Sequence, residues 1–194
     1  MIKIAKAGIS ENTKCFLLGN SMGGLIALMF AFQNPDVIDG LVVSSPSLGI
    51  KVKVPGFKMV MGKSMSSIWP TLSFGNELDT SKISRDKEVV KKYDQDPFKH
   101  GKVTARWFTE FLATMEKAQR LAPAMKIPIL MQVAGDDHLL DGKASKFSYE
   151  KLGSKDKALH DSDGLYNDIY NELEPDRKKV LDDLEKWIMT RLRD

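Results

Sequence analysis

Cysteine is the scarcest residue in this chain of 194 amino acids, with Cys15 as its single representative. One cysteine excludes a disulfide framework and a metal site built from several thiolates, and it favours a reducing, cytoplasmic location. No apolar stretch is long enough to span a bilayer, and the first residues lack the apolar core of a signal peptide. The net charge of +3 is small and forms no basic stripe, which argues against nucleic acid binding. We expect neither a metal nor a cofactor.

The remaining composition is that of an ordinary globular protein. Hydrophobic residues make up 42% of the chain and charged residues of both signs 28%, the proportions of a globular protein. The length is sufficient for one domain with a buried core.

The most informative stretch is residues 19–24, which read Gly-Asn-Ser-Met-Gly-Gly. A short apolar run typical of a buried strand precedes it, and a longer one typical of a buried helix follows. A Gly-x-Ser-x-Gly pattern on a strand-to-helix turn is the context of a nucleophile elbow. We expect a strained backbone at Ser21, and crowding that forbids a Cβ at Gly19 and Gly23. The Ser21 hydroxyl would then project at a helix N-terminus, where negative charge is favoured.

Apolar runs and helical periodicity predict an α/β protein with a mostly parallel sheet flanked by helices. Between Pro46 and Pro123 no buried strand is predicted, so this part is interpreted as a helical insertion. The expected domain organisation is a core of residues 1–46 and 124–194, with a cap at 47–123. The expected strands are 14–19, 38–44, 127–134 and 156–160, and the expected helices are 2–9, 22–33, a Met-rich helix from Pro55, 84–93, 102–120, 143–152 and one from Pro175.

Several stretches together resemble the monoacylglycerol lipase and lysophospholipase branch of the α/β-hydrolase fold. The resemblance implies the C-terminal part of that fold, with the insertion as a cap over an acyl pocket. It implies a serine hydrolase that cleaves carboxylic esters through an acyl-enzyme, with a small lipid or ester as its substrate. The stretches that carry it are residues 19–24, 84–97, 127–141 and 164–172.

The resemblance also assigns roles to residues. Ser21 matches the nucleophile, and the N–H of Met22 matches one oxyanion donor. The acid follows the strand at 127–134. The family's acidic pattern places it at Asp137, with Asp141 as the trailing residue and Asp136 as the rival assignment.

The third member of the triad departs from the family. Asn167 stands where the family has histidine, and an amide has no basic lone pair near neutral pH. Asn20 replaces the histidine that usually precedes the nucleophile. The remaining histidines, at positions 100, 138 and 160, are interpreted as surface residues, and His160 is not expected to reach Ser21.

A second departure is length. The family's domain begins well before the elbow and includes a loop that gives a second oxyanion donor, whereas this chain begins at the helix before the nucleophile strand. We therefore expect incomplete catalytic machinery. We also expect strand 14–19 to lack a neighbour on one side, which favours self-association.

The insertion supplies the candidate substrate-binding residues Met61, Met65 and Trp69, because methionine and tryptophan suit an acyl chain. Interleaved lysines would permit transient contact with a membrane surface. Two functions follow from the sequence. One is a lipid-ester hydrolase, and the alternative is a catalytically impaired relic or acyl-lipid-binding protein.

Overall fold

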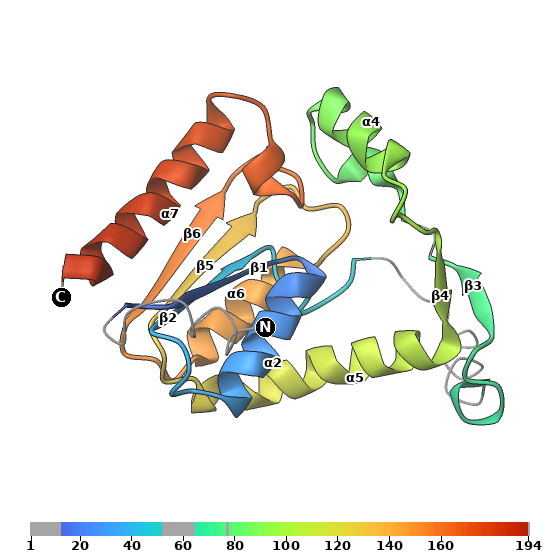
Figure 1. Ribbon diagram of the computed structural model, residues 1–194, viewed down its shortest axis with the longest axis horizontal. Coiled ribbons are helices and arrows are strands. Elements are labelled where there is room, and N and C mark those ends of the chain that lie inside the picture. Colours follow the sequence, from blue (N-terminus) through green and yellow to red (C-terminus); the bar gives the residue numbers. More distant parts are fainter. Residues whose placement is uncertain (1–12, 52–64, 77, 194) are drawn as a thin grey trace.

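A fully parallel four-stranded sheet forms the centre of the computed structural model, which describes residues 13–51, 65–76 and 78–193 (Figure 1). The strand order is β1-β2-β5-β6, so β2 and β5 pair directly although the insertion separates them in sequence. The strands are β1 (Phe16–Asn20), β2 (Gly40–Ser44), β5 (Ile129–Ala134) and β6 (Lys157–Ser162).

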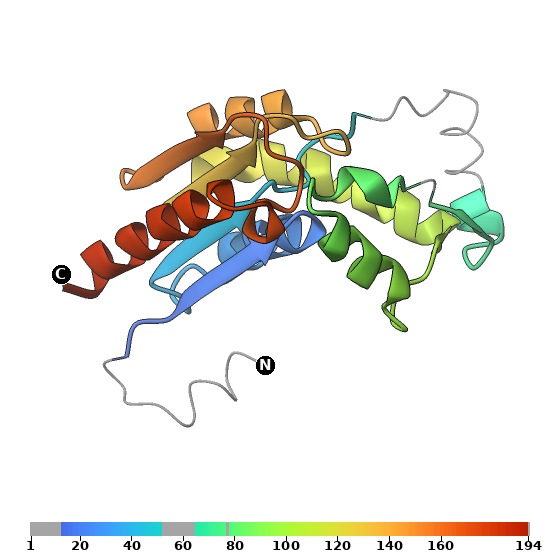
Figure 2. The same ribbon diagram turned by 90° about the horizontal axis from the view of Figure 1, so that it is seen from above.

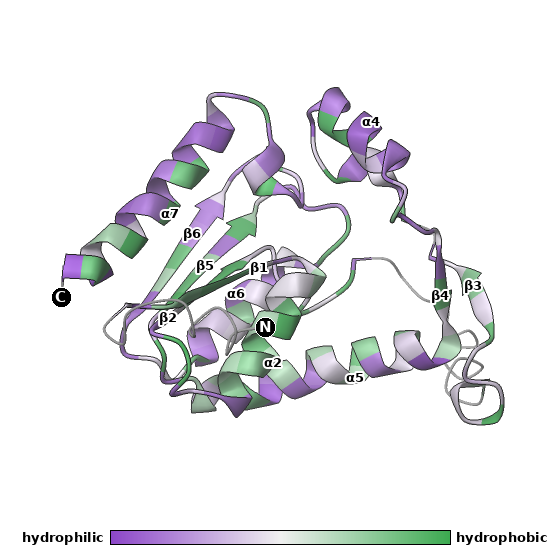
Figure 3. Ribbon diagram, viewed as in Figure 1, coloured by the Kyte–Doolittle hydropathy of each residue, from purple (hydrophilic) through white to green (hydrophobic). Residues whose placement is uncertain are grey.

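Helices cover both faces of the sheet. Helices α2 (Met22–Gln33), α5 (Ala105–Leu121) and α6 (Gly142–Lys151) lie on one face, and α7 (Asp176–Arg193) lies on the other (Figure 1). Side chains alternate along each strand, so neighbouring residues of one strand enter different cores. In Figure 3 the ribbons of β1 and much of α2 are coloured as hydrophobic, whereas α7 alternates hydrophobic and hydrophilic residues. This is the predicted α/β architecture.

The insertion between β2 and β5 holds helix α4 (Lys87–Gln95) and, unpredicted, a short antiparallel ribbon of β3 (Ser73–Gly75) and β4 (Lys102–Thr104). The predicted helix at 102–120 therefore starts later, because Thr104 is extended and its side chain caps α5. Asp86 caps α4 in the same way, which moves the predicted start at 84 to Lys87. Residues 65–68 are helical.

The two ends of α5 have different surroundings. Met115 and Ala118, in its second half, are buried in the core beneath the sheet, whereas its first residues adjoin the ribbon. The expected helices at 2–9 and from Pro55 fall wholly or largely outside the described residues. No helix within the described ranges is long and apolar enough to cross a membrane.

Candidate active site

Ser21 occupies a sharp turn between β1 and α2. Its backbone has φ 52° and ψ −119°, a conformation that non-glycine residues rarely adopt. The Ser21 N–H donates to the Ser44 carbonyl at 2.8 Å, which anchors the turn to the neighbouring strand. Ser21 is also the N-cap residue of α2, yet its side chain makes no capping hydrogen bond. The hydroxyl is therefore not committed to the helix, although serine usually caps in this position. The predicted strained elbow is confirmed.

The glycines of the elbow are not equivalent. A Cβ on Gly19 would lie 2.3 Å from the Gly23 carbonyl oxygen, and one on Gly24 would lie 3.0 Å from Pro46 Cβ. A Cβ on Gly23 would have no heavy atom within 4 Å. The expectation that Gly23 must lack a Cβ is therefore wrong, because the crowded atom of Gly23 is its carbonyl and not its Cα.

Met22 is the first residue of α2. Helix geometry leaves the N–H groups of the first turn without partners inside the helix, so the Met22 N–H is free to meet a ligand oxygen. The adjacent Gly24 and Leu25 N–H groups instead bond the Ser21 carbonyl.

The acidic turn after β5 buries one carboxylate and exposes the other. Asp137 is 4% exposed, and its Oδ1 accepts from the N–H groups of Leu139 (2.8 Å) and Leu140 (2.9 Å). Its Oδ2 accepts from Asn167 Nδ2 at 2.8 Å. Asp136 is half exposed, and its Oδ2 lies 3.2 Å from His138 Nε2. The expectation that Asp137, and not Asp136, meets Asn167 is confirmed.

Asp141, the trailing acidic residue, has a local role. Its side chain accepts from the Lys143 N–H and caps α6.

Asn167 lies in the loop after β6 and is 4% exposed. Its side-chain N–H points at the carboxylate of Asp137, as the N–H of an imidazole would in a catalytic triad. None of the three histidines takes the place of Asn167 at the Asp137 carboxylate. His160 belongs to β6, the strand farthest from β1, and its Nδ1 lies 3.3 Å from Asp183 Oδ2 of α7. His138 packs edge-on against Tyr166, and His100 is exposed.

Asp168, the next residue, is a partly buried carboxyl. Burial raises its pKa above the ordinary 3.8, although a hydrogen bond from Asn171 Nδ2 acts in the opposite direction. Its ionised form is therefore disfavoured in the folded protein.

A segment after β2 connects the elbow to the acidic turn. The Ser47 N–H donates to the Ser21 carbonyl at 3.0 Å, and Lys51 Nζ donates to the Asp137 carbonyl at 2.6 Å. Sequence reasoning missed this connection, since neither residue type signals it. The segment thus connects the nucleophile turn and the acid turn through one main-chain hydrogen bond and one lysine side chain.

The predicted substrate-binding residues lie elsewhere or outside the described ranges. Met61 is not among the described residues. Met65 and Trp69 lie beside the start of α5, and Figures 1 and 2 show this segment, in teal, at the end of the insertion away from the sheet. Trp69 is 58% exposed. The structure does not bring either residue to Ser21, and their contact with an acyl chain stays a prediction.

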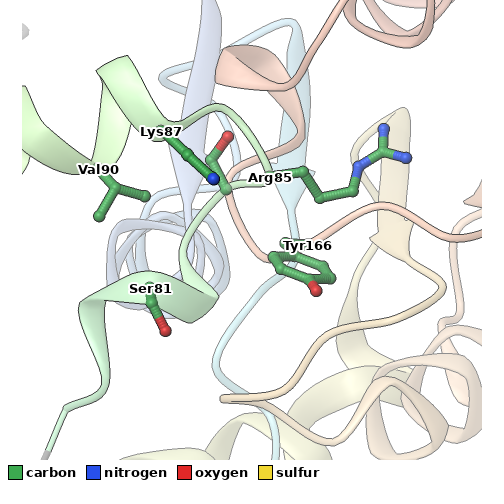
Figure 4. A pocket seen from close by; sticks show the side chains of 6 residues that line it. Ser81, Arg85, Lys87, Val90 and Tyr166 are labelled. Atoms are coloured by element: carbon green, nitrogen blue, oxygen red, sulfur yellow. The ribbon is translucent and has the colours of Figure 1, made fainter.

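A cavity of about 300 Å³ lies where the insertion meets the loop after β6 (Figure 4). Tyr166 forms one wall and the start of α4 forms another. The Arg85 guanidinium points away from Lys87 and Val90. The lining residues are Ser81, Ser84, Arg85, Lys87, Val90 and Tyr166.

Comparison with known proteins identifies the family. The family model described as "Serine aminopeptidase, S33" (Hydrolase_4) matches residues 1–174. The chain belongs to this family of α/β-hydrolases. Phospholipase YtpA of Bacillus subtilis is 36% identical over 168 residues, which are 85% of this chain and 64% of the relative. Monoglyceride lipase of Rattus norvegicus is 30% identical over 179 residues, covering 91% and 59%.

Solved structures of similar proteins agree with the fold. The monoacylglycerol lipase of Paleococcus ferrophilus superposes with a TM-score of 0.86 at 32% identity, over 98% of this chain and 74% of that one. The monoglyceride lipase of Saccharomyces cerevisiae superposes with a TM-score of 0.83 at 21% identity. The chain spans less than two thirds of the length of the two curated relatives described above.

Proposed function

We propose that this Hydrolase_4 chain carries the nucleophile and acid of a serine hydrolase that acts on carboxylic esters of lipids, of the monoacylglycerol or lysophospholipid type. The observation that carries the proposal is the strained Ser21, whose hydroxyl is not used to cap α2. Backbone strain of this kind clusters at functional sites, and here the side chain of the strained residue is not used to cap the helix. The monoglyceride lipases and the phospholipase among its relatives support the choice of lipid esters.

In the proposed reaction Ser21 Oγ bonds to the acyl carbon, and the Met22 N–H stabilises the oxyanion. The bond to the alcohol oxygen then breaks, and the alcohol leaves with the proton that Ser21 gave up. Water hydrolyses the acyl-enzyme in the second half and restores the hydroxyl. Asp137 is the acid that orients the side chain at position 167.

Asn167 limits this chemistry. Its amide can accept the orientation that Asp137 imposes but cannot take the Ser21 proton, so the proton must pass to water. The proposal therefore includes slow acylation, by a factor typical of the loss of a general base, about 10²–10⁴.

The test is labelling of the full chain with a fluorophosphonate probe, followed by peptide mapping. We expect slow, stoichiometric modification of Ser21 and none in Ser21→Ala. A Ser47→Ala variant is the matched control, because it removes a neighbouring buried hydroxyl outside the proposed reaction. Absence of labelling in the folded wild-type chain would contradict the hydrolase proposal.

The alternative is an acyl-lipid-binding protein that has lost its chemistry, and Asn167 is the observation that favours it. Under this alternative a non-hydrolysable ether analogue of a monoacylglycerol binds the chain, and Ser21 stays unmodified by the probe. The predicted acyl contacts, Met61, Met65 and Trp69, serve either function. Trp69→Ala should weaken binding of the analogue, and unchanged affinity would show that Trp69 does not contact the acyl chain.

We also propose self-association through β1. Among the described residues β1 pairs only with β2, and nearby Leu18 and Ile26 are 46% and 59% exposed. An edge of this kind is a template for pairing with a second copy. Sedimentation velocity should detect association that Leu18→Lys weakens, and a monomer at all concentrations would contradict it.

Transient membrane contact is proposed for the outer end of the insertion, where Ile68 and Trp69 are exposed. Co-sedimentation with anionic phosphatidylglycerol vesicles should be reduced by Ile68→Ser. Equal recovery of both proteins in the supernatant would contradict this contact.

A further inference from the structure

The side chain of Glu172 is a carboxylate with no exposed surface. It accepts hydrogen bonds from three main-chain N–H groups and from the side chain of one arginine. Its Oε1 accepts from the N–H groups of Tyr166 (2.9 Å) and Arg85 (3.2 Å). Its Oε2 accepts from Arg85 Nε (2.8 Å) and the Leu173 N–H (3.3 Å). Arg85 belongs to the insertion, whereas Tyr166 and Leu173 flank the loop that holds Asn167. We call the pair of Arg85 and Glu172 the clasp.

Two further bonds join the same segments. Ser84 Oγ donates to the Asn171 carbonyl at 2.7 Å, and the Asp168 N–H donates to the Ile83 carbonyl at 2.9 Å. The residues on both sides of Asn167 therefore have their N–H groups held, one by Glu172 and one by the insertion. Figure 4 shows Arg85 and Tyr166 side by side at this junction.

The clasp requires a carboxylate. Each oxygen of Glu172 accepts from two N–H donors, so an amide in its place would set an NH₂ group against two donors in either orientation. A neutral substitute of the same size thus cannot keep the four bonds. This requirement separates the clasp from ordinary packing, which a glutamine would preserve.

We propose that Arg85 and Glu172 are positioning residues for the side chain at position 167. They touch neither Asp137 nor Ser21, and they act by fixing the loop so that the side chain at 167 reaches the Asp137 carboxylate. The orientation of that side chain therefore depends on residues of the insertion, which would otherwise be taken for a cap alone. The inference rests on the proposed role of position 167 as the base position.

The test uses the wild-type chain and reads the hydrogen bond between Asn167 and Asp137 directly. Hydrogen exchange of the Asn167 side-chain NH₂, followed by NMR, is compared with that of the Met131 amide in the buried β5. In Glu172→Gln we expect exchange at Asn167 to be faster by about tenfold or more, with Met131 unchanged. Asp176→Asn is the matched control. It removes the second ion pair of Arg85 (2.5 Å) but leaves all four bonds of Glu172, so Asn167 should exchange as in the wild type.

The inference is overturned if Asn167 exchange is unchanged in Glu172→Gln, or if Asn167 and Met131 accelerate equally, since the latter indicates general destabilisation. If Glu172→Gln does not fold, Arg85→Met provides the same comparison, because the main-chain N–H of residue 85 remains. Labelling of Ser21 does not enter this measurement. Failure of the proposed hydrolase function and failure of the clasp are therefore distinguishable.

Discussion

The turn after β1 and the loop after β6 are both held in place by hydrogen bonds to their main-chain groups, but they differ in the side chain that they present. At the first turn Ser21 offers a hydroxyl that the helix does not use. At the second loop Asn167 offers an amide whose N–H is directed at Asp137. The backbone of each loop is fixed by neighbours that do not contact the side chain at the critical position. A change of side chain there can therefore remove reactivity without disturbing the fold.

The largest expected effect comes from giving the loop after β6 a base that can serve the serine of the turn after β1. Asn167→His introduces a base whose N–H can bond Asp137, and we expect hydrolysis of short p-nitrophenyl esters to rise by about 10²–10⁴-fold. The gain should disappear in the double variant with Ser21→Ala. Equal rates in the two variants would mean that Ser21 is not a nucleophile.

A second comparison lies within the elbow itself. Gly19→Ala should lower the free energy of unfolding by about 3 kcal/mol or more, because its Cβ would overlap the Gly23 carbonyl. Gly23→Ala should be neutral or stabilising by up to about 1 kcal/mol, since alanine favours the helix and the space is open. Urea denaturation measures both. Comparable losses in the two variants would contradict the contact geometry.

The two neighbouring carboxylates of the acidic turn should also differ in their contribution to the free energy of unfolding, by a smaller amount. Asp137→Ala leaves three N–H donors without their acceptor, and we expect a loss of about 2–4 kcal/mol in unfolding free energy. Asp136→Ala, which removes a half-exposed group, should cost about 0.5 kcal/mol or less. Thermal unfolding of both variants checks the difference, and a larger loss for Asp136→Ala would reverse our assignment.

The smallest expected effect concerns Asp168 and depends on pH. Burial raises its pKa in the folded state, so ionisation penalises the fold above that pKa and the penalty vanishes below the unfolded value of 3.8. Asp168→Asn should therefore raise Tm at pH 7, by about 2 °C. The advantage should shrink as the pH falls through the raised pKa. An equal gain at pH 7 and pH 3 would point to packing and not to charge.

How far the sequence predicts this molecule differs between its parts. Apolar runs identified the strands and helices of the sheet region, because burial imposes periodicity on residues close in sequence. The ribbon of β3 and β4 escaped detection, since three-residue exposed strands leave no such pattern. Family resemblance located Ser21, Asp137 and Asn167, and the structure brings the last two into contact.

The remaining features depend on contacts between residues that the sequence does not pair. Two partners of Glu172, Tyr166 and Arg85, lie six and 87 positions away, and a single sequence gives no measure of such pairing. Gly23 shows the same limit. A pattern of glycines indicates a tight turn but cannot tell which one faces a neighbouring atom.

The order of the strands has a consequence for assembly. Leu41 of β2 sits beside Ile129 of β5, so the middle of the sheet closes only after roughly 90 intervening positions have been made and returned. The entropy of closing this loop is lost before the stabilising contacts form. Those contacts include the packing of Met115 of α5 in the core. Until then β2 can pair with β1 and β5 with β6, but the edges of β2 and β5 that face each other stay unpaired. Refolding should accordingly be slow and sensitive to protein concentration. Pairing of β2 with β5 across the insertion should be its rate-limiting step.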